Sequence, residues 1–301
     1  MTEIFFLGTG ASVPSRERGL PAMAVRFGRD IVLFDCGEGT QRQFMVSPLS
    51  FMKVKAVFVT HLHGDHFLGL PGLLLTMGLS GRSEPLRIVG PQGTRCLLEN
   101  ILGACGDSLP FDLAVTESAG GESFSFSGFC VTAFPTRHGV PSVGFLFSED
   151  DRTGIDAAKA AEKGVSPADI RLIKGGGVVD GISSEDISSG TVKGIRIVYT
   201  GDTLPCDEVR SAAMGADVLV HEATFGSDET ESAGKHNHAT SVQAAEVAKE
   251  CGVRMLVLNH VSNRYKDRSP LLEEAAVIFP DTMVAEDFLH LVVTRKDIRS
   301  V

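Results

Sequence analysis

The residues most able to do chemistry are concentrated in one short segment, Thr60-His61-Leu62-His63-Gly64-Asp65-His66. Three histidines and one aspartate within six residues, in a chain with only nine histidines, are expected by chance on the order of once in a thousand chains or less. Residues two apart in an extended segment point the same way, so His61 and His63 can bind one metal ion together. Gly64 then allows a turn, after which Asp65 and His66 can bind a second ion. Imidazole and carboxylate groups are ligands that zinc prefers, so we expect a metal site here.

Three further candidate ligands, His138, Asp202 and His260, each follow a segment of strand length and composition. These segments are Val131–Phe134, Ile195–Thr200 and Met255–Asn259. Taken alone, a histidine at a strand end is more often a surface residue, and Gly-Asp is usually a turn. Beside the first cluster they complete a two-metal site, which needs about seven protein ligands including a bridging carboxylate.

The complete set resembles the ligand set of the metallo-β-lactamase superfamily. By that resemblance three imidazoles hold a first zinc ion, one carboxylate and two imidazoles hold a second, and an aspartate bridges the two. In this chain the first set is His61, His63 and His138, the second set is Asp65, His66 and His260, and the bridge is Asp202. The resemblance implies two Zn²⁺ ions per subunit, although other divalent metals can fill such a site.

Further motifs resemble the ribonuclease Z family within that superfamily, over nearly the whole chain. They are Phe6-Leu7-Gly8-Thr9-Gly10, Phe34-Asp35-Cys36-Gly37-Glu38-Gly39-Thr40-Gln41, His221-Glu222-Ala223-Thr224, His238-Ala239-Thr240 and Asn259-His260-Val261-Ser262. The resemblance implies an α/β fold, a four-layer αββα sandwich with a protruding arm. It also implies a homodimeric, zinc-dependent endoribonuclease that removes the 3′ trailer of precursor tRNA. Such an enzyme cuts just after the discriminator base and leaves a 3′-hydroxyl.

Two segments depart from the family pattern. The family's Pro-x-Lys-x-Arg-Asn loop, which is linked to sensing the CCA end, appears as Pro14-Ser15-Arg16-Glu17-Arg18-Gly19, with Arg in place of Lys and Gly in place of Asn. Residues 149–194 lie where the family has its tRNA-binding arm, but they lack the Gly-Pro signature of bacterial members. We expect them to form a flexible inserted arm.

Roles in catalysis follow from the residue types. Asp65 is the expected base or orienter for the attacking water, and His238 is the expected proton donor to the leaving oxygen, with Glu222 orienting it. The alternative for His238 is a residue at a helix start facing water. Arg16, Arg18 and Arg264 are candidate RNA contacts, although a solvated surface charge is the commoner role of any single arginine.

The elements that must position these residues form two β-rich halves, each followed by helices, within a single domain of residues 1–301. The expected strands are Ile4–Leu7, Ala22–Phe27, Ile31–Asp35, Ala56–Thr60, Val131–Phe134, Val143–Phe147, Ile195–Thr200, Val218–His221, Met255–Asn259 and Phe288–Val293. The expected helices are Phe67–Leu79, Gln92–Cys105, Thr240–Cys251 and Pro270–Phe279. Within the arm only Asp156–Lys163 has a helical pattern.

The overall composition limits which cellular compartment and which binding partners are expected. The six cysteines are dispersed without a CxxC pair, which favours a reducing cytoplasm over a disulfide framework. Ile4–Leu7 is too short for a signal peptide, and Phe67–Leu79 is too short and too interrupted to span a bilayer, so no membrane association is expected. The net charge of −10 means that RNA contacts must be local or carried by bound cations.

Two other functions fit part of the pattern. Another member of the superfamily acting on a small phosphodiester or ester would use the same ligands, but it would not need the arm or the Pro14–Gly19 loop. A non-catalytic RNA-binding module that kept the fold would be expected to have lost metal ligands, and none is lost here.

Overall fold

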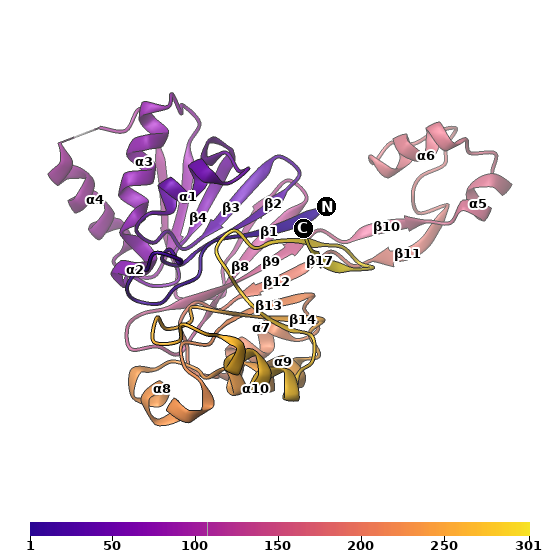
Figure 1. Ribbon diagram of the computed structural model, residues 1–301. Coiled ribbons are helices and arrows are strands. Elements are labelled where there is room, and N and C mark those ends of the chain that lie inside the picture. The colour runs from indigo at the N-terminus through magenta and orange to yellow at the C-terminus, as the bar shows by residue number, and fades with distance from the viewer. Residues whose placement is uncertain (107) are drawn as a thin grey trace.

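Two mixed β-sheets pack face to face in the computed structural model, which describes residues 1–106 and 108–301 (Figure 1). From edge to edge, the first sheet contains β17 (Ile298–Ser300), β16 (His290–Val293), β1 (Thr2–Gly8), β2 (Ala22–Phe27), β3 (Asp30–Phe34), β4 (Val54–Phe58), β5 (Leu86–Gly90) and β6 (Leu113–Glu117). The second contains β15 (Thr282–Val284), β14 (Met255–Asn259), β13 (Val218–Glu222), β12 (Arg196–Tyr199), β9 (Val143–Glu149), β8 (Phe129–Pro135) and β7 (Ser123–Phe126).

Helices cover the outer face of each sheet. The first sheet is covered by α1 (Thr40–Val46), α3 (Gly69–Leu79) and α4 (Thr94–Cys105), and the second by α7 (Asp207–Ala213), α9 (Ser241–Cys251) and α10 (Ser269–Ile278). The short elements are η1 (Phe51–Lys53), α2 (Gly64–Phe67), η2 (Ser227–Glu229) and α8 (Thr230–His236). In the described part of the chain, no helix is both long enough and apolar enough to cross a membrane. The αββα sandwich predicted from the sequence is confirmed.

The central strands are apolar on both faces because both faces are covered. In β1, Ile4 and Phe6 face the core between the sheets, while Phe5 and Leu7 face the helices. Each such side chain contributes about 1.5–3 kcal/mol when it is buried. Aromatic rings fill much of the space between the sheets, which fixes the spacing of the two layers that carry the site.

Most predicted elements are present with shifts of a few residues at their ends. The predicted helix 67–79 begins earlier, as α2 and α3, and the helix predicted over 92–105 begins at Thr94. The structure adds elements that the sequence patterns did not predict, namely α1, η1, β5, β6, β7, α7, η2, α8, β15 and β17. Most of these are short or lie at the edges of the sheets, where apolar periodicity is weak.

Residues 152–192 project from the sandwich as a separate lobe (Figure 1). The antiparallel pair β10 (Arg152–Ile155) and β11 (Ser188–Val192) forms its stalk, and α5 (Ala157–Glu162) and α6 (Pro167–Lys174) form its tip. The expectation of a single helix here is wrong, because α6 is a second one, opened by a capping box between Ser166 and Asp169. A small apolar core holds the lobe together through Ala160, Val165, Ile173 and Ile187.

The topology brings several strand ends to one edge of the sandwich. β3, β4 and β5 are parallel neighbours in the first sheet, as are β12, β13 and β14 in the second. Side chains beyond the carboxyl ends of parallel strands meet at one edge of the sheet, which is where open α/β sheets bind ligands. The segments after β4, β12 and β14 contain His61, Asp202 and His260, so these residues are brought to a common edge.

Candidate metal centre and active-site cleft

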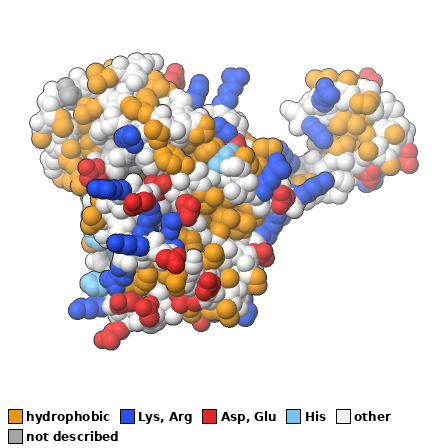
Figure 2. Space-filling view, in the orientation of Figure 1, with side chains coloured by type: hydrophobic (Ala, Val, Ile, Leu, Met, Phe, Trp, Pro, Cys, Tyr) orange, Lys and Arg blue, Asp and Glu red, His pale blue; other side chains and the backbone are white. Residues whose placement is uncertain are grey.

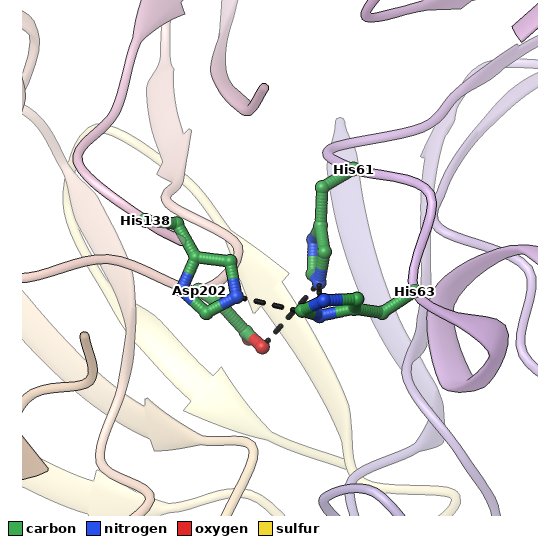
Figure 3. Close-up of side chains that lie close together, drawn as sticks. All are labelled: His61, His63, His138 and Asp202. Carbon is green, nitrogen blue, oxygen red and sulfur yellow. Dashed lines mark hydrogen bonds and ion pairs between the residues drawn. The ribbon is translucent and has the colours of Figure 1, made fainter. Parts of the chain in front are cut away.

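The first group of predicted ligands converges from both sheets. His61 and His63 follow β4, His138 follows β8 and Asp202 follows β12. One ligand atom from each of these four residues lies within 4.8 Å of the others, and Figure 3 shows the side chains pointing toward one another. Asp202 Oδ2 lies 3.6 Å from His61 Nε2.

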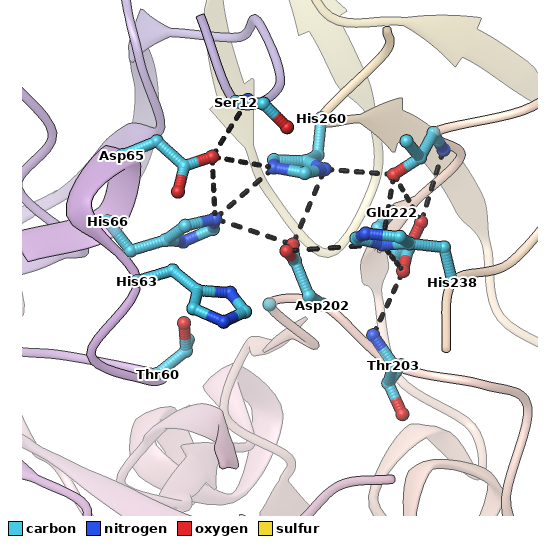
Figure 4. A network of polar contacts seen from close by, with 12 residues as sticks. Ser12, Thr60, His63, Asp65, His66, Asp202, Thr203, Glu222, His238 and His260 are labelled. Carbon is cyan, nitrogen blue, oxygen red and sulfur yellow. Dashed lines mark hydrogen bonds and ion pairs between the residues drawn. The ribbon is translucent and has the colours of Figure 1, made fainter. Parts of the chain in front are cut away.

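The second group lies directly beside the first. Asp65 and His66 from α2 face His260 from the segment after β14, again within 4.8 Å of one another. The second oxygen of Asp202, Oδ1, lies 3.5 Å from His66 Nε2 and 3.4 Å from His260 Nδ1. Asp202 therefore faces both groups, the first in Figure 3 and the second in Figure 4, one with each carboxylate oxygen.

A close approach between the two halves places Asp202. Gly201, immediately before it, adopts φ +60°, and a Cβ there would lie 2.6 Å from the Thr60 side chain of the other sheet. Only glycine combines that backbone conformation with so little space. The glycine therefore lets the β12 end approach the β4 end closely.

Asp35, at the end of β3, orients the imidazoles of the first half. This fully buried carboxylate accepts a hydrogen bond from His66 Nδ1 at 2.7 Å and others from Thr60 N–H and Oγ1 at 2.7 and 2.9 Å. The Thr60 hydroxyl in turn lies 3.0 Å from His61 Nδ1. A partner on the outer nitrogen fixes the ring orientation and leaves Nε2 of both histidines facing the centre.

Glu222, at the end of β13, has the matching role in the second half. It is buried and accepts hydrogen bonds from His238 Nδ1 at 2.8 Å and from the Thr224 hydroxyl at 2.7 Å. The Thr224 hydroxyl lies 2.9 Å from His260 Nδ1, and the Thr203 backbone N–H donates to Glu222 at 3.0 Å. Figure 4 shows this network extending from Glu222 to both histidines.

Charge and burial set the protonation of the cluster. Burial, with the neighbouring imidazoles, lowers the pKa of His61 and of His63, so both rings are neutral at neutral pH. Burial alone would raise the pKa of Asp65 and Asp202, but the surrounding histidines outweigh it and hold both values below the ordinary range. Burial would lower the pKa of His66, but Asp202 and Asp35 raise it instead, so this ring must release a proton when it binds a metal ion. Neutral imidazole and ionised carboxylate are the forms that bind a metal cation.

The donor set fits divalent cations. Among the described residues, Asp202 Oδ1 is a buried carboxylate oxygen that accepts no hydrogen bond. Imidazole nitrogens of His66 and His260 lie 3.5 and 3.4 Å from this oxygen without forming a hydrogen bond to it, and a cation beside a buried anionic oxygen lowers the cost of burying it. Imidazoles and carboxylates on two adjacent groups of this kind are typical of a site for divalent ions such as zinc.

His238 belongs to neither of these two groups, although one of its nitrogens lies within 4.8 Å of ligand atoms of Asp202 and His260. Burial lowers its pKa, but the charge of Glu222 and the hydrogen bond to it prevail and raise the pKa to about 9. Its side chain also lies in the cleft, which has a volume of about 380 Å³ and is lined by residues that include His63, Asp65, His138 and Asp202. The arrangement places a protonated imidazole beside the candidate metal centre.

The three arginines predicted to contact RNA lie in different surroundings. Arg16 is exposed, and Arg264 lies in the lining of the cleft, where its guanidinium stacks on Phe225 and pairs with Glu229 at 2.8 Å. Arg18 is buried and donates hydrogen bonds to backbone carbonyls. Arg16 and Arg264 are therefore both accessible, Arg264 in the cleft and Arg16 in a second pocket, whereas Arg18 is turned into the protein.

Asp35, Thr60 and Thr224 are functional candidates that the sequence patterns missed. Each is polar and lies at the end of an apolar strand, the same signal that pointed to His138 and His260. Asp35 also lies in a family-like motif, but neither signal distinguishes a residue that orients a ligand from a turn residue.

Comparisons with known proteins agree with this site. A family model described as a beta-lactamase superfamily domain matches residues 31–158. The chain is 43% identical to ribonuclease Z of Archaeoglobus fulgidus, over 97% of this chain and 98% of the relative. It is 41% identical to ribonuclease Z of Methanothermobacter thermautotrophicus, over 99% of this chain and 98% of the relative.

The chain belongs to the ribonuclease Z family. The crystal structure of the short form of human tRNase Z superimposes on it with a TM-score of 0.72 and 31% identity, covering 97% of this chain and 99% of that one. Family membership and the His/Asp cluster together indicate the use of divalent metal ions.

The Asp35 network predicts a specific metal-binding defect. Asp35→Asn keeps the shape but not the negative charge beside His66 Nδ1, so we expect the affinity for divalent cations to fall by about 10- to 100-fold. Competition with a chromogenic chelator measures it. Tyr199→Phe is the matched control, because it removes another donor to the same Asp35 oxygen, at 2.9 Å, without altering a histidine. An unchanged affinity in Asp35→Asn would contradict this role.

Proposed function

We propose that this chain is a zinc-dependent endoribonuclease that removes the 3′ trailer of precursor tRNA. It hydrolyses the phosphodiester bond just after the discriminator base and leaves a 3′-hydroxyl on the tRNA. Full-length relatives named ribonuclease Z support the substrate class. The homodimer and the cytoplasmic location expected from the sequence stay predictions.

The observation that supports this function most strongly is the geometry of the cleft. Two groups of metal-binding side chains share Asp202, and His238 lies beside them with Nδ1 2.8 Å from Glu222. Phosphodiester hydrolysis needs an activated water on one side of phosphorus and a proton donor for the leaving oxygen on the other. The cleft offers groups for both tasks.

Seven side chains would hold the two zinc ions, with Asp202 between them. When bound, the pair supplies an acidified water and positive charge beside the phosphoryl oxygens. Asp65 is ionised and held in place by the Ser12 backbone N–H, which donates to Oδ2 at 2.8 Å. Asp65 can therefore orient the attacking water and accept its proton.

His238 would donate the proton that the leaving 5′ oxygen needs. The charge of Glu222 keeps the ring protonated, and the hydrogen bond at Nδ1 leaves Nε2 free to face the substrate. The buried Glu222 is itself held by the backbone N–H groups of Thr203 and Thr224. His238 and Glu222 thus act as a donor and its orienting base.

RNA contacts must be local, because the chain has a net charge of −10. Arg264 lines the cleft, Arg16 lines a second pocket together with Lys266 and Arg268, and the projecting lobe exposes Arg171 and Lys174 on α6. Figure 2 shows basic, acidic and apolar side chains side by side on the lobe. We assign the lobe to gripping the body of the tRNA, away from the cut.

The function is tested by incubating the zinc-loaded protein with a 3′-extended tRNA and mapping the product ends. We expect one cut after the discriminator base. Asp65→Ala and Asp202→Ala should each abolish it, because the first removes the water's base and the second the shared ligand. Wild-type rates in the Asp65 variant would contradict the mechanism.

Turnover of bis-p-nitrophenyl phosphate without any tRNA cut would favour a small-phosphodiester enzyme, and absence of bound metal would favour a non-catalytic RNA-binding module.

The proton-donor role of His238 predicts a dependence on the leaving group. His238→Ala should slow tRNA cleavage by about 10²- to 10⁴-fold. Hydrolysis of bis-p-nitrophenyl phosphate should change far less, because p-nitrophenolate leaves without a proton. His236→Ala is the matched control, since His236 also lines the cleft but lies outside the Glu222 network. Equal losses on both substrates would show that His238 does not act as the donor.

The lobe predicts a separation of tRNA binding from chemistry. Arg171→Ala with Lys174→Ala should raise KM for precursor tRNA, while the rate on bis-p-nitrophenyl phosphate stays unchanged. Lys53→Ala with Lys55→Ala removes two exposed charges near the start of β4, opposite the cleft, and is the control for net charge alone. Equal effects of the two pairs on KM would exclude a specific grip by the lobe.

A further inference from the structure

Arg18 is a buried cation whose partners lie next to a candidate metal ligand. It is 7% exposed. Its guanidinium donates to the Val261 carbonyl at 2.7 Å, to the Ser262 carbonyl at 3.2 Å and to Asn263 Oδ1 at 2.8 Å. All three acceptors lie in the segment that directly follows His260. The planar guanidinium holds several acceptors in a fixed fork, whereas the three donors of a lysine all radiate from one nitrogen and cannot reproduce that geometry.

The same N-terminal loop also reaches the other side of this metal half-site. Ser12, six residues before Arg18, donates its backbone N–H to Asp65 Oδ2 at 2.8 Å, and Gly10 forms a β-bridge with Val261. Asn263 donates back to the Val13 carbonyl. The loop thus contacts both Asp65, from the first half of the chain, and the segment of His260, from the second half.

The base of the loop is fixed independently of the metal centre. Asp287 accepts hydrogen bonds from Thr9 Oγ1 at 2.8 Å, from the Gly19 N–H at 2.7 Å and from Gln43 Nε2 at 2.9 Å. These contacts hold both ends of the loop against the first sheet. Because the loop is fixed at its base, it can hold the segment after His260 in a defined position relative to that sheet.

The His260 backbone needs such support. His260 adopts φ +54°, the left-handed region that a histidine rarely occupies. Conformations of this kind cost about 1–3 kcal/mol and persist only where the surroundings impose them. The Arg18 bonds to Val261 and Ser262 hold the peptide groups immediately after this turn.

We propose that Arg18 is a positioning residue for the half-site of Asp65, His66 and His260, and that it acts through the backbone after His260 rather than by contacting RNA. The inference rests on the metal centre of the proposed function. If so, loss of the Arg18 guanidinium lowers the affinity for the ion in this half-site. The affinity for the other ion, which His61, His63 and His138 would hold, stays unchanged.

Zinc binding to the full-length protein tests this directly. Chelator-treated wild type, Arg18→Lys and Arg18→Met are titrated with Zn²⁺ against a chromogenic chelator, and the melting temperature of each metal-free protein is recorded. We expect wild type to bind two equivalents. In Arg18→Lys one equivalent should keep its affinity and the other should weaken by about 10- to 100-fold. In the double variant Arg18→Lys with His63→Ala, the affinity for both zinc equivalents should fall.

Arg82→Lys is the matched control for the loss of a buried arginine. Arg82 is 4% exposed and likewise donates to three backbone carbonyls, those of Val54, Glu84 and Pro85. Its partners lie at the start of β4 and before β5, at the ends opposite the metal centre. Arg82→Lys should lower the melting temperature without changing either zinc affinity.

The outcomes separate this inference from the function on which it rests. Wild-type protein that binds no zinc would overturn both. If the wild type binds two zinc ions and both Arg18→Lys and Arg18→Met bind them with the same two affinities, the inference alone is overturned. Slower tRNA cleavage by those variants would then indicate that Arg18 contacts RNA. If Arg18→Lys lowered the affinity for both zinc ions equally, or if Arg82→Lys lowered one of the two affinities in the same way, Arg18 would contribute only to the overall stability of the protein.

Discussion

Two buried carboxylates, one from each half of the chain, determine the geometry of the site. Asp35 holds His66 directly and His61 through the Thr60 hydroxyl, while Glu222 holds His238 directly and His260 through the Thr224 hydroxyl. A buried carboxylate needs hydrogen-bond donors, so each of these two fixes the rings around it. The inner nitrogens are thereby left to face a common space. The two halves thus use the same device, a strand-end carboxylate with a threonine as intermediary.

The cost of this arrangement is met by the sandwich that surrounds it. Asp35 and His260 both adopt left-handed backbone conformations, and Asp202 has a buried oxygen without a hydrogen bond among the described residues. Such features persist where the surroundings over-determine them. Here the parallel strands fix where each chain segment emerges, and the aromatic core between the sheets fixes their separation. Function is concentrated where local preferences are overridden, as expected of an evolved site.

The sequence predicted the sandwich and the residues that meet at its edge, because short runs of apolar and β-branched residues mark the strands and rare residue types mark their ends. The sequence did not predict the hydrogen-bond partners that orient these residues. Thr60 and Thr224 are ordinary strand-end residues until the third dimension places a histidine beside each. Arg18 looked like a surface charge because nothing in its neighbours along the chain shows that Val261 and Ser262 cover it. The second helix of the lobe, α6, had a usable signal in Ser166-Pro167-Ala168-Asp169, but the glycines that follow obscured it.

Two divalent cations are expected to lie between these two sets of fixed imidazoles and to share Asp202. Anomalous diffraction at the zinc edge, from crystals of the zinc-loaded protein, tests it most directly. We expect two strong peaks about 3.5–4 Å apart. One peak should lie among His61, His63 and His138 and the other among Asp65, His66 and His260, with an Asp202 oxygen toward each. A single peak, or peaks away from Asp202, would contradict it.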